Sequence, residues 1–437
     1  MTIIGIAGII LAFVLLIYLI MKGVNIYLIA FLCSVIVAIT GQINVYEALK
    51  NYYMLGFTNF FKANFFIFLT GTLLGKAMDV TGAAKSIAKM IVNLIGSDLA
   101  FISVPLACGV LCYGGVSAFV CAFAVFPIAL QVFRAADLPR NYIPAALCFG
   151  CSTFAMVAPG APQIHNTIPA NILGTDIMSG VVNGFLSCGF MLVFGMIWLG
   201  LMLKKQKAVG AHFIAKPMDV FSEEDEKTPN GVLALVPLLV CVGIINIKVN
   251  GAPIAPVEVG VFVGAVLTVL FFHQFIDVHQ LPHYFGEGTK TAITSITNTC
   301  AVVGFGTVVS NSAVFGKIID AMLNIPGPKL LGLAVGTTVI AGICGSASGG
   351  LGIAVPILGP AYVAQGIAPA VVHRLMSISS SALDSLPHNG YIVTVTNGLC
   401  NETHKDAYLP IFKLTVLTPL LGTVVAVILF TLFPTLP

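Results

Sequence analysis

Charged residues are scarce in this sequence. Only 8% of its 437 residues are Asp, Glu, Lys or Arg, 58% are hydrophobic, and the mean hydropathy is +1.02. Charged residues make up about a quarter of a typical soluble domain, so the composition excludes a water-soluble globule. The net charge of +3 is too small, and the basic residues are too scattered, for a nucleic-acid partner. We therefore predict an all-α polytopic membrane protein.

Motifs for enzymes and metal sites are also lacking. The 11 cysteines lie in or beside apolar runs, and the C-x-x-C spacing of Cys148 and Cys151 has no second pair or histidine beside it. The stretch 345–349 lacks the central serine of a nucleophile elbow, and 71–76 is one residue short of a P-loop. We predict no enzymatic activity, no metal site and no cofactor apart from a coupling ion.

Apolar segments, in contrast, are abundant and fall into two sets. The first set lies near 3–21, 24–40, 65–80, 99–133, 141–173 and 177–203, and the second near 231–247, 255–272, 291–312, 330–365, 369–398 and 409–433. Only the stretch between them is hydrophilic, with an acidic run at 223–227. We expect an N-terminal repeat at 1–203, a cytoplasmic linker at 204–230 and a C-terminal repeat at 231–437. No basic residue precedes 3–21, which favours a first span over a signal peptide.

The two sets are related in sequence. The stretch 112–117 matches 344–349, and a constant offset pairs Ser152 with Ser380 and Pro159 with Pro387. The fourth segment of each half is too long for one span and is interrupted by Gly and Ser, which predicts a re-entrant hairpin. The fifth segment is interrupted at 152–165 or at 379–390, which predicts a discontinuous helix near the membrane midplane.

The number of crossings predicts the topology. If each hairpin enters and leaves by the same face, each half crosses the membrane five times. Two related halves with an odd number of crossings must then have inverted orientations. Most Lys and Arg residues, including Lys204, Lys205 and Lys216, lie on one side if the linker is inside. Because basic residues concentrate in short cytoplasmic loops, we expect the linker inside and both termini outside.

The two hairpin tips are candidate anion sites. Glycine allows close approach of a ligand, and each helix that restarts after a tip presents free N–H groups and a positive dipole end. The tip residues expected to bind substrate are Gly114, Gly115, Ser117, Ser346, Ser348 and Gly349. The alternative is close helix packing through small residues, which is common in membranes.

The two interruptions of the fifth segments differ in charge. The second contains Asp384 and His388, four residues apart, whereas the first contains no acidic residue. Ionisable residues inside a membrane are functional candidates. A carrier that moves protons needs a group whose proton affinity changes with its access to water and with bound substrate. We predict that Asp384 and His388 couple proton movement. The alternative is that Asp384 caps the restarting helix and His388 orients it.

Further polar residues near the interruptions complete the candidate site. Ser380, Ser381, Asn389 and His165 are expected to bind substrate, with a purely structural histidine as the alternative for His165. Arg374 is either a counter-ion for an anionic substrate or a side chain that snorkels to the interface. The cluster 310–312 is a further polar group without a counterpart in the first half.

The stretch from Asp384 to Gly390, followed by Thr403-His404-Lys405, resembles the corresponding part of the GntP family of permeases, particularly its 3-hydroxybutyrate members. The wider layout resembles the ion transporter superfamily, in which two inverted repeats surround a midplane site. The resemblance implies proton-coupled uptake of a small hydroxy-monocarboxylate across the bacterial inner membrane by alternating access. Gluconate-type members differ at this stretch, so a sugar acid such as gluconate is the less favoured substrate.

Two other mechanisms remain open from the sequence. Carbonyl groups of broken helices and Ser or Asn oxygens also suit Na⁺, so a Na⁺-coupled carboxylate symporter is the main alternative. A channel would instead be expected to show rings of charge or carbonyl filters. The expected partners are a small organic anion and the lipid bilayer, with a homodimer left open.

Overall fold

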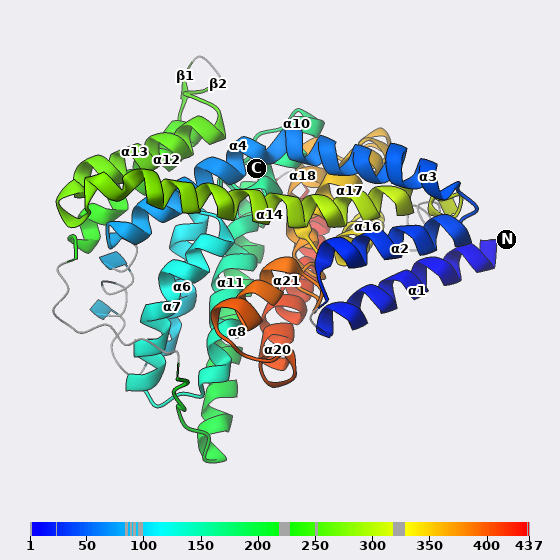
Figure 1. Ribbon diagram of the computed structural model, residues 1–437. Helices are drawn as coiled ribbons and strands as arrows, with labels where there is room; N and C mark the ends of the chain where they lie inside the picture. Colours follow the sequence, from blue (N-terminus) through cyan, green and yellow to red (C-terminus); the bar gives the residue numbers. More distant parts are fainter. Residues whose placement is uncertain are drawn as a thin grey trace.

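The computed structural model describes residues 2–22, 24–83, 86–87, 90, 93–94, 99–217, 228–249, 252–317, 328–434 and 436. This part of the chain is almost entirely helical (Figure 1), which confirms the all-α prediction. The exception is a short antiparallel pair of strands, β1 (Lys248–Val249) and β2 (Ala252–Pro253). The acidic run of the linker, 223–227, lies outside the described residues.

The helices of the first half begin near the N-terminus and end in the linker. They are α1 (Thr2–Met21), α2 (Ile26–Thr40), α3 (Val45–Glu47), η1 (Ala48–Tyr53), α4 (Met54–Val80), α6 (Ala100–Tyr113), α7 (Ala118–Ala135), η2 (Arg140–Tyr142), α8 (Ile143–Ser152), α9 (Phe154–Val157), α10 (Ile164–Leu173) and α11 (Val181–Ala208).

The helices of the second half follow the linker. They are α12 (Gly231–Asn246), α13 (Val257–Phe272), η3 (His273–Phe275), η4 (Val278–Gln280), α14 (Leu281–Ser310), α16 (Lys329–Cys344), α17 (Ala347–Ala364), α18 (Pro369–Ser380), α19 (Gly390–Val393), η5 (Thr394–Leu399), α20 (His404–Phe412), η6 (Lys413–Leu417) and α21 (Thr418–Leu432).

Helices α4 and α14 form the centre of the packing. They lie side by side, with α2 against α14 at one end and α13 against α4 at the other (Figure 1). Contacts between the halves also occur in matching pairs: α10 packs on α17, and η5 packs on α7. Because α7 packs on α4 and α17 on α14, both hairpins are held against the central pair.

Four helical stretches of the described chain are long and apolar enough to cross a membrane on their own. They are Val181–Ala208, Val257–Phe275, Ala347–Ala364 and His404–Leu432, and shorter apolar helices accompany them. Many large apolar side chains on α1, α2, α11 and α13 are exposed, as expected for surfaces that face lipid. The fold is therefore that of a multi-pass membrane protein.

The helices are interrupted where the sequence predicts interruptions. Helices α6 and α7 meet at a tip where Gly115 has φ +97°, and α16 and α17 meet where Gly345 has φ +56°. Only glycine adopts these left-handed conformations at little cost, so each tip can turn within a few residues. The breaks in the fifth segments separate α8 from α10 and α18 from α19.

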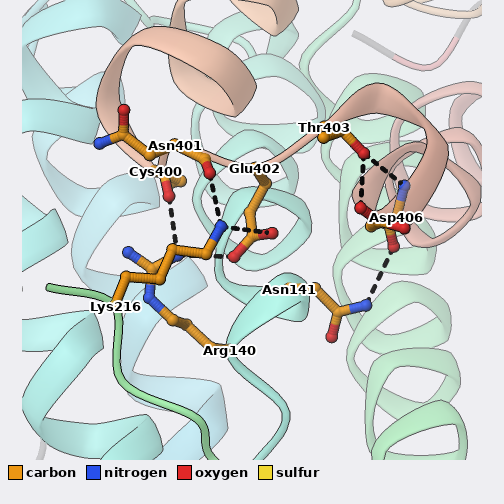
Figure 2. Close-up of polar contacts among 8 residues, drawn as sticks. All are labelled: Arg140, Asn141, Lys216, Cys400, Asn401, Glu402, Thr403 and Asp406. Carbon is orange, nitrogen blue, oxygen red and sulfur yellow. Dashed lines mark hydrogen bonds and ion pairs between the residues drawn. The ribbon is translucent and has the colours of Figure 1, made fainter.

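A buried ion-pair cluster joins the halves at the start of the linker (Figure 2). The Nη1 atom of Arg140, which begins η2, lies 2.6 Å from Oε1 of Glu402 and donates to the carbonyl of Cys400 at 2.7 Å. Lys216 of the linker reaches the other carboxylate oxygen of Glu402 at 2.9 Å. The arginine and the carboxylate are both nearly inaccessible, so the two charges compensate each other.

The linker is attached to the first half as well. Nδ1 of His212 lies 2.6 Å from Oδ2 of Asp137, and the amide of Phe213 donates to Oδ1 at 3.0 Å. The bond with His212, followed by the bond from Phe213, holds the pKa of Asp137 below its ordinary value. The segment from His212 to Lys216 thus connects the loop before α8 to the loop before α20.

Candidate functional site

A cavity of about 140 Å³ lies between the two tips and the two breaks. Its polar lining comes from Ser117, Ser346 and Ser348 at the tips, Ser152, Gln163 and His165 at the first break, and Asp384, Asn389 and Tyr391 at the second. An engineered cavity of about 150 Å³ in another protein holds benzene, so this one has room for a ligand of about six or seven non-hydrogen atoms.

Each tip rests on the break of its own half. A Cβ atom on Gly115 would lie 2.9 Å from Cγ of Pro162, and one on Gly345 would lie 2.2 Å from Cδ2 of His388. The missing side chains therefore allow the backbone of each tip to approach the broken helix closely.

Hydrogen bonds hold the tips in this position. Nε2 of Gln163 donates to the carbonyl oxygens of Cys112 at 2.6 Å and Val116 at 3.1 Å. Nε2 of His388 lies 3.0 Å from the carbonyl oxygen of Gly342, and it must carry the proton because a carbonyl only accepts. Each broken helix therefore supplies one polar side chain that anchors the neighbouring hairpin.

Asp384 is the acidic group of the cavity. Its side chain is 3% exposed, and Oδ1 accepts a hydrogen bond from Oγ of Ser385 at 2.9 Å. Among the described residues that line the cavity, none is Lys or Arg. A charge at Asp384 is thus without an opposite charge in the cavity wall, which is costly at low dielectric.

Asn389, and not Asp384, caps the helix that restarts after the second break. Its Oδ1 accepts from the amides of Tyr391 at 2.7 Å and Ile392 at 3.0 Å, and its Nδ2 donates to the carbonyl of Asp384 at 2.9 Å. The structure therefore contradicts the alternative in which Asp384 is the cap. No helix remains between α18 and α19, so the spacing of four does not put Asp384 and His388 on one helical face.

Arg374 holds the first break together. The side chain is 0% exposed and donates to the carbonyl oxygens of Val157 at 2.7 Å, Ile177 at 2.6 Å and Ser179 at 2.8 Å, and to Oδ1 of Asn166. It neither lines the cavity nor snorkels to an interface, so both sequence-based interpretations of Arg374 are wrong. Its charge is compensated by oxygen atoms of the break and of the loop after α10.

The structure brings many of the predicted site residues together. Gly115, Ser117, His165, Ser346, Ser348, Asp384 and Asn389 line the cavity. Gly114, Gly349, Ser380, Ser381 and His388 are not among its lining residues.

Local hydrogen bonds and packing explain these exclusions. The hydroxyls of Ser380 and Ser381 donate to the carbonyls of Ser377 and Ile378 at 2.7 Å, because the helix continues far enough to offer those acceptors. The amide of Gly349 donates to Oγ of Ser346, and Gly114 packs against Leu238.

Three residues of the polar lining described above were not predicted as site residues from the sequence. Ser152 and Gln163 belong to the first break, and Tyr391 follows the cap of α19. A polar amide directly after the second proline of the interruption at 152–165 was the available signal for Gln163. Nδ1 of His165 is buried and has no hydrogen-bond partner within the described chain. Asn311 is exposed and donates to the carbonyl of Thr307, outside this cavity.

A larger and more open cavity, of about 1050 Å³, adjoins the first one. Ile67 lines both, and the larger cavity also contains Lys62, Asp176 and Glu258.

Comparisons with known proteins point to transport. No protein-family model matches the chain. YxjC of Bacillus subtilis, named an uncharacterized transporter, is 33% identical over 94% of this chain and 95% of its own length. The D-serine transporter DsdX of Escherichia coli is 25% identical over 77% of this chain and 78% of its own length.

Two solved structures share the fold. The YdaH transporter of Alcanivorax borkumensis superimposes with a TM-score of 0.59 at 17% identity, covering 88% of this chain and 89% of its own. MtrF of Neisseria gonorrhoeae, described with a class of antimetabolite efflux pumps, gives a TM-score of 0.52 at 14% identity, covering 89% and 84%. These matches are transporters and not enzymes, in agreement with the absence of enzyme motifs.

Proposed function

The chain belongs to the transporter family that includes YxjC of Bacillus subtilis, and from this premise we propose that it is a secondary active transporter of the GntP type. It takes up a small organic anion together with a proton by alternating access. The favoured substrate class is a hydroxy-monocarboxylate such as 3-hydroxybutyrate.

The position of Asp384 carries this proposal. An anionic substrate in the cavity would face this carboxylate with no Lys or Arg among the described lining residues. Two negative charges about 5 Å apart repel by roughly 3 kcal/mol at an effective dielectric constant of about 20. Substrate binding is therefore favoured by roughly a hundredfold when Asp384 is protonated, and the same energy links proton binding to substrate binding.

The remaining polar groups suit a carboxylate and a hydroxyl group. Ser117, Ser346 and Ser348 lie at the starts of α7 and α17, where helix dipoles and amide groups favour an anion. His165 and Tyr391 are further polar residues of the lining, and their side chains are of a kind that suits a substrate hydroxyl.

The size of the cavity supports a small substrate. A four-carbon hydroxy acid has about seven non-hydrogen atoms, which a volume near 140 Å³ accommodates. Gluconate has roughly twice as many and would require the cavity to expand. The cavity thus favours the 3-hydroxybutyrate class over sugar acids.

The matching contacts between the halves support inverted repeats, each with five spans and a re-entrant hairpin. The linker is then cytoplasmic, with both termini outside the inner membrane, as the distribution of Lys and Arg favours. Alternating access would expose the cavity to each side in turn.

A small hydroxy amino acid is a second candidate substrate. One relative of the chain is named a D-serine transporter, and a substrate ammonium group could pair with ionised Asp384. Such a zwitterion would not require protonation of Asp384. Coupling to Na⁺ in place of H⁺ is the other alternative.

Uptake into proteoliposomes distinguishes these possibilities. Purified protein would be tested with labelled 3-hydroxybutyrate, D-serine and gluconate, under an inward proton gradient or an inward Na⁺ gradient imposed separately. We expect concentrative uptake of 3-hydroxybutyrate driven by the proton gradient. Uptake driven only by Na⁺, or uptake of D-serine alone, would favour an alternative, and no uptake of any of the three would contradict the proposal.

A further inference from the structure

Three polar residues of helix α18 in the second half, His373, Arg374 and Ser377, contact the segment of the first half that contains α10. Nδ1 of His373 lies 2.7 Å from Oγ1 of Thr175, and Oγ of Ser377 donates to the carbonyl of His165 at 2.7 Å. Arg374 lies between these contacts and makes the largest number of bonds. The helix is therefore attached to the first break along its buried face.

The oxygen atoms that Arg374 contacts lie on both sides of α10. Val157 precedes the helix, Ile177 and Ser179 follow it, and Asn166 belongs to its first turn. The Nδ2 atom of Asn166 in turn donates to the carbonyls of Ala158 and Ala161, both at 2.9 Å. One guanidinium group thus fixes the break and both ends of the helix that carries His165.

Helix α11 is shaped around the aliphatic part of Arg374. A Cβ atom on Gly180 would lie 2.8 Å from Cβ of Arg374, and one on Gly184 would lie 2.9 Å from its Cδ. A larger residue at either position would displace the side chain. The close fit shows that the arginine occupies a dedicated space between α10, α11 and α18.

The location of α18 links this clamp to the proposed coupling residue. The helix ends at Ser380, and Asp384 follows in the second break. His165 and Asp384 both line the cavity, so α18 connects the segments that bear its imidazole and its carboxylate. A stiff connection at this place can transmit a movement of the second break to the first.

We propose that Arg374 is a positioning residue that makes the segment bearing Asp384 and the segment bearing His165 move as one unit, so that substrate changes access only together with the coupling ion. The proposal rests on the proposed transport function, although not on which ion drives it. Arginine suits this role because its planar group donates several bonds in fixed directions, whereas lysine offers a single charged nitrogen atom.

The test compares two activities of the same variant in proteoliposomes. Counterflow, the exchange of labelled for unlabelled substrate without an ion gradient, requires binding and a change of access. Accumulation driven by the ion gradient that the wild type uses also requires the coupling group and the substrate site to move together. Arg374→Lys is expected to reduce accumulation at least tenfold while reducing counterflow less than threefold.

Arg140→Lys is the matched control, since Arg140 is also buried and bonded to carbonyl and carboxylate oxygens but lies in the cluster of Figure 2. It is expected to reduce the amount of folded protein without changing the ratio of accumulation to counterflow. An equal loss of both activities in Arg374→Lys would show a merely structural role and overturn the proposal.

Ser377→Ala keeps the proposal testable if Arg374→Lys does not fold. This variant removes the hydrogen bond from Ser377 to the carbonyl of His165 and leaves no buried charged group without its partners. We expect a two- to fourfold drop in accumulation relative to counterflow, and an unchanged ratio would overturn the proposal. Failure of the proposed function itself would instead appear in the wild type, as transport that no ion gradient drives.

Discussion

Replacing Gly345 with alanine tests the contact between the second tip and the second break. Gly345 ends α16 with φ +56° and ψ 31°, a left-handed conformation that costs an alanine about 1–2 kcal/mol. The new Cβ would also lie 2.2 Å from Cδ2 and 2.5 Å from Nε2 of His388, so the ring must move. Losing its bond to the carbonyl of Gly342 adds about 1–3 kcal/mol, since that buried acceptor is left without its donor.

Gly174→Ala is the matched control for this substitution. Gly174 ends α10 with φ +64° and ψ 33°, and no atom lies within 4 Å of its added Cβ. We therefore expect Gly174→Ala to lower the free energy of unfolding by about 1–2 kcal/mol and Gly345→Ala by about 2–5 kcal/mol. Unfolding of the detergent-solubilised protein by titration with sodium dodecyl sulfate measures both values.

A double-mutant cycle shows whether His388 causes the difference. When His388→Ala removes the ring, Gly345→Ala should cost no more than Gly174→Ala, so the two changes are not additive. Equal costs for the two glycine substitutions, or additive effects in the double mutant, would refute the proposed contact between the tip and the break.

Three further predictions concern other parts of the chain. Ser348→Ala should raise KM for substrate about fivefold, from the loss of about 1 kcal/mol, whereas Ser380→Ala should change it less than twofold because that hydroxyl bonds to its own helix. Glu402→Gln should lower the free energy of unfolding by about 3–5 kcal/mol by leaving a buried arginine without its counter-charge, against less than about 1 kcal/mol for the exposed Asp406→Asn. The pKa of Asp137 is lower in the folded chain than its ordinary value of 3.8, so the contact of the Asp137 carboxylate with the linker is fully present above pH 3.8 and is lost as the pH falls through the lower folded value. Amide hydrogen exchange in the linker segment from His212 to Lys216 should accelerate in that lower pH range. In Asp137→Asn the same segment should exchange fast at every pH.

The positions of the interruptions were accessible from the sequence because few residues are tolerated in the middle of an apolar helix. Gly115 and Gly345 mark the tips through their backbone freedom, and Asp384 stands out as an acid within an apolar segment. These features depend on local composition, which a single sequence contains.

The direction of individual side chains was not accessible in the same way. Ser380 and Asp384 belong to one polar run, yet the first lies at the end of α18 and bonds to its own helix, whereas the second lines the cavity. Asp384 and Asn389 are both good caps, and only the starting point of α19 decides between them. The role of Arg374 depends on partners about two hundred residues away, for which the sequence offers no local signal.

Proton uptake upon substrate binding tests the central claim most directly. Purified protein in weakly buffered detergent solution would be mixed with 3-hydroxybutyrate near neutral pH while a pH indicator records protons taken from solution. The measurement is repeated at increasing pH, because only an Asp384 that is ionised before binding can take up a proton. Since the substrate anion favours the protonated form of Asp384, the wild type should take up protons, up to one per substrate bound, at the pH values where the free site is ionised, and Asp384→Asn should take up none. Binding without proton uptake in the wild type at every pH, or undiminished proton uptake in Asp384→Asn, would contradict the account.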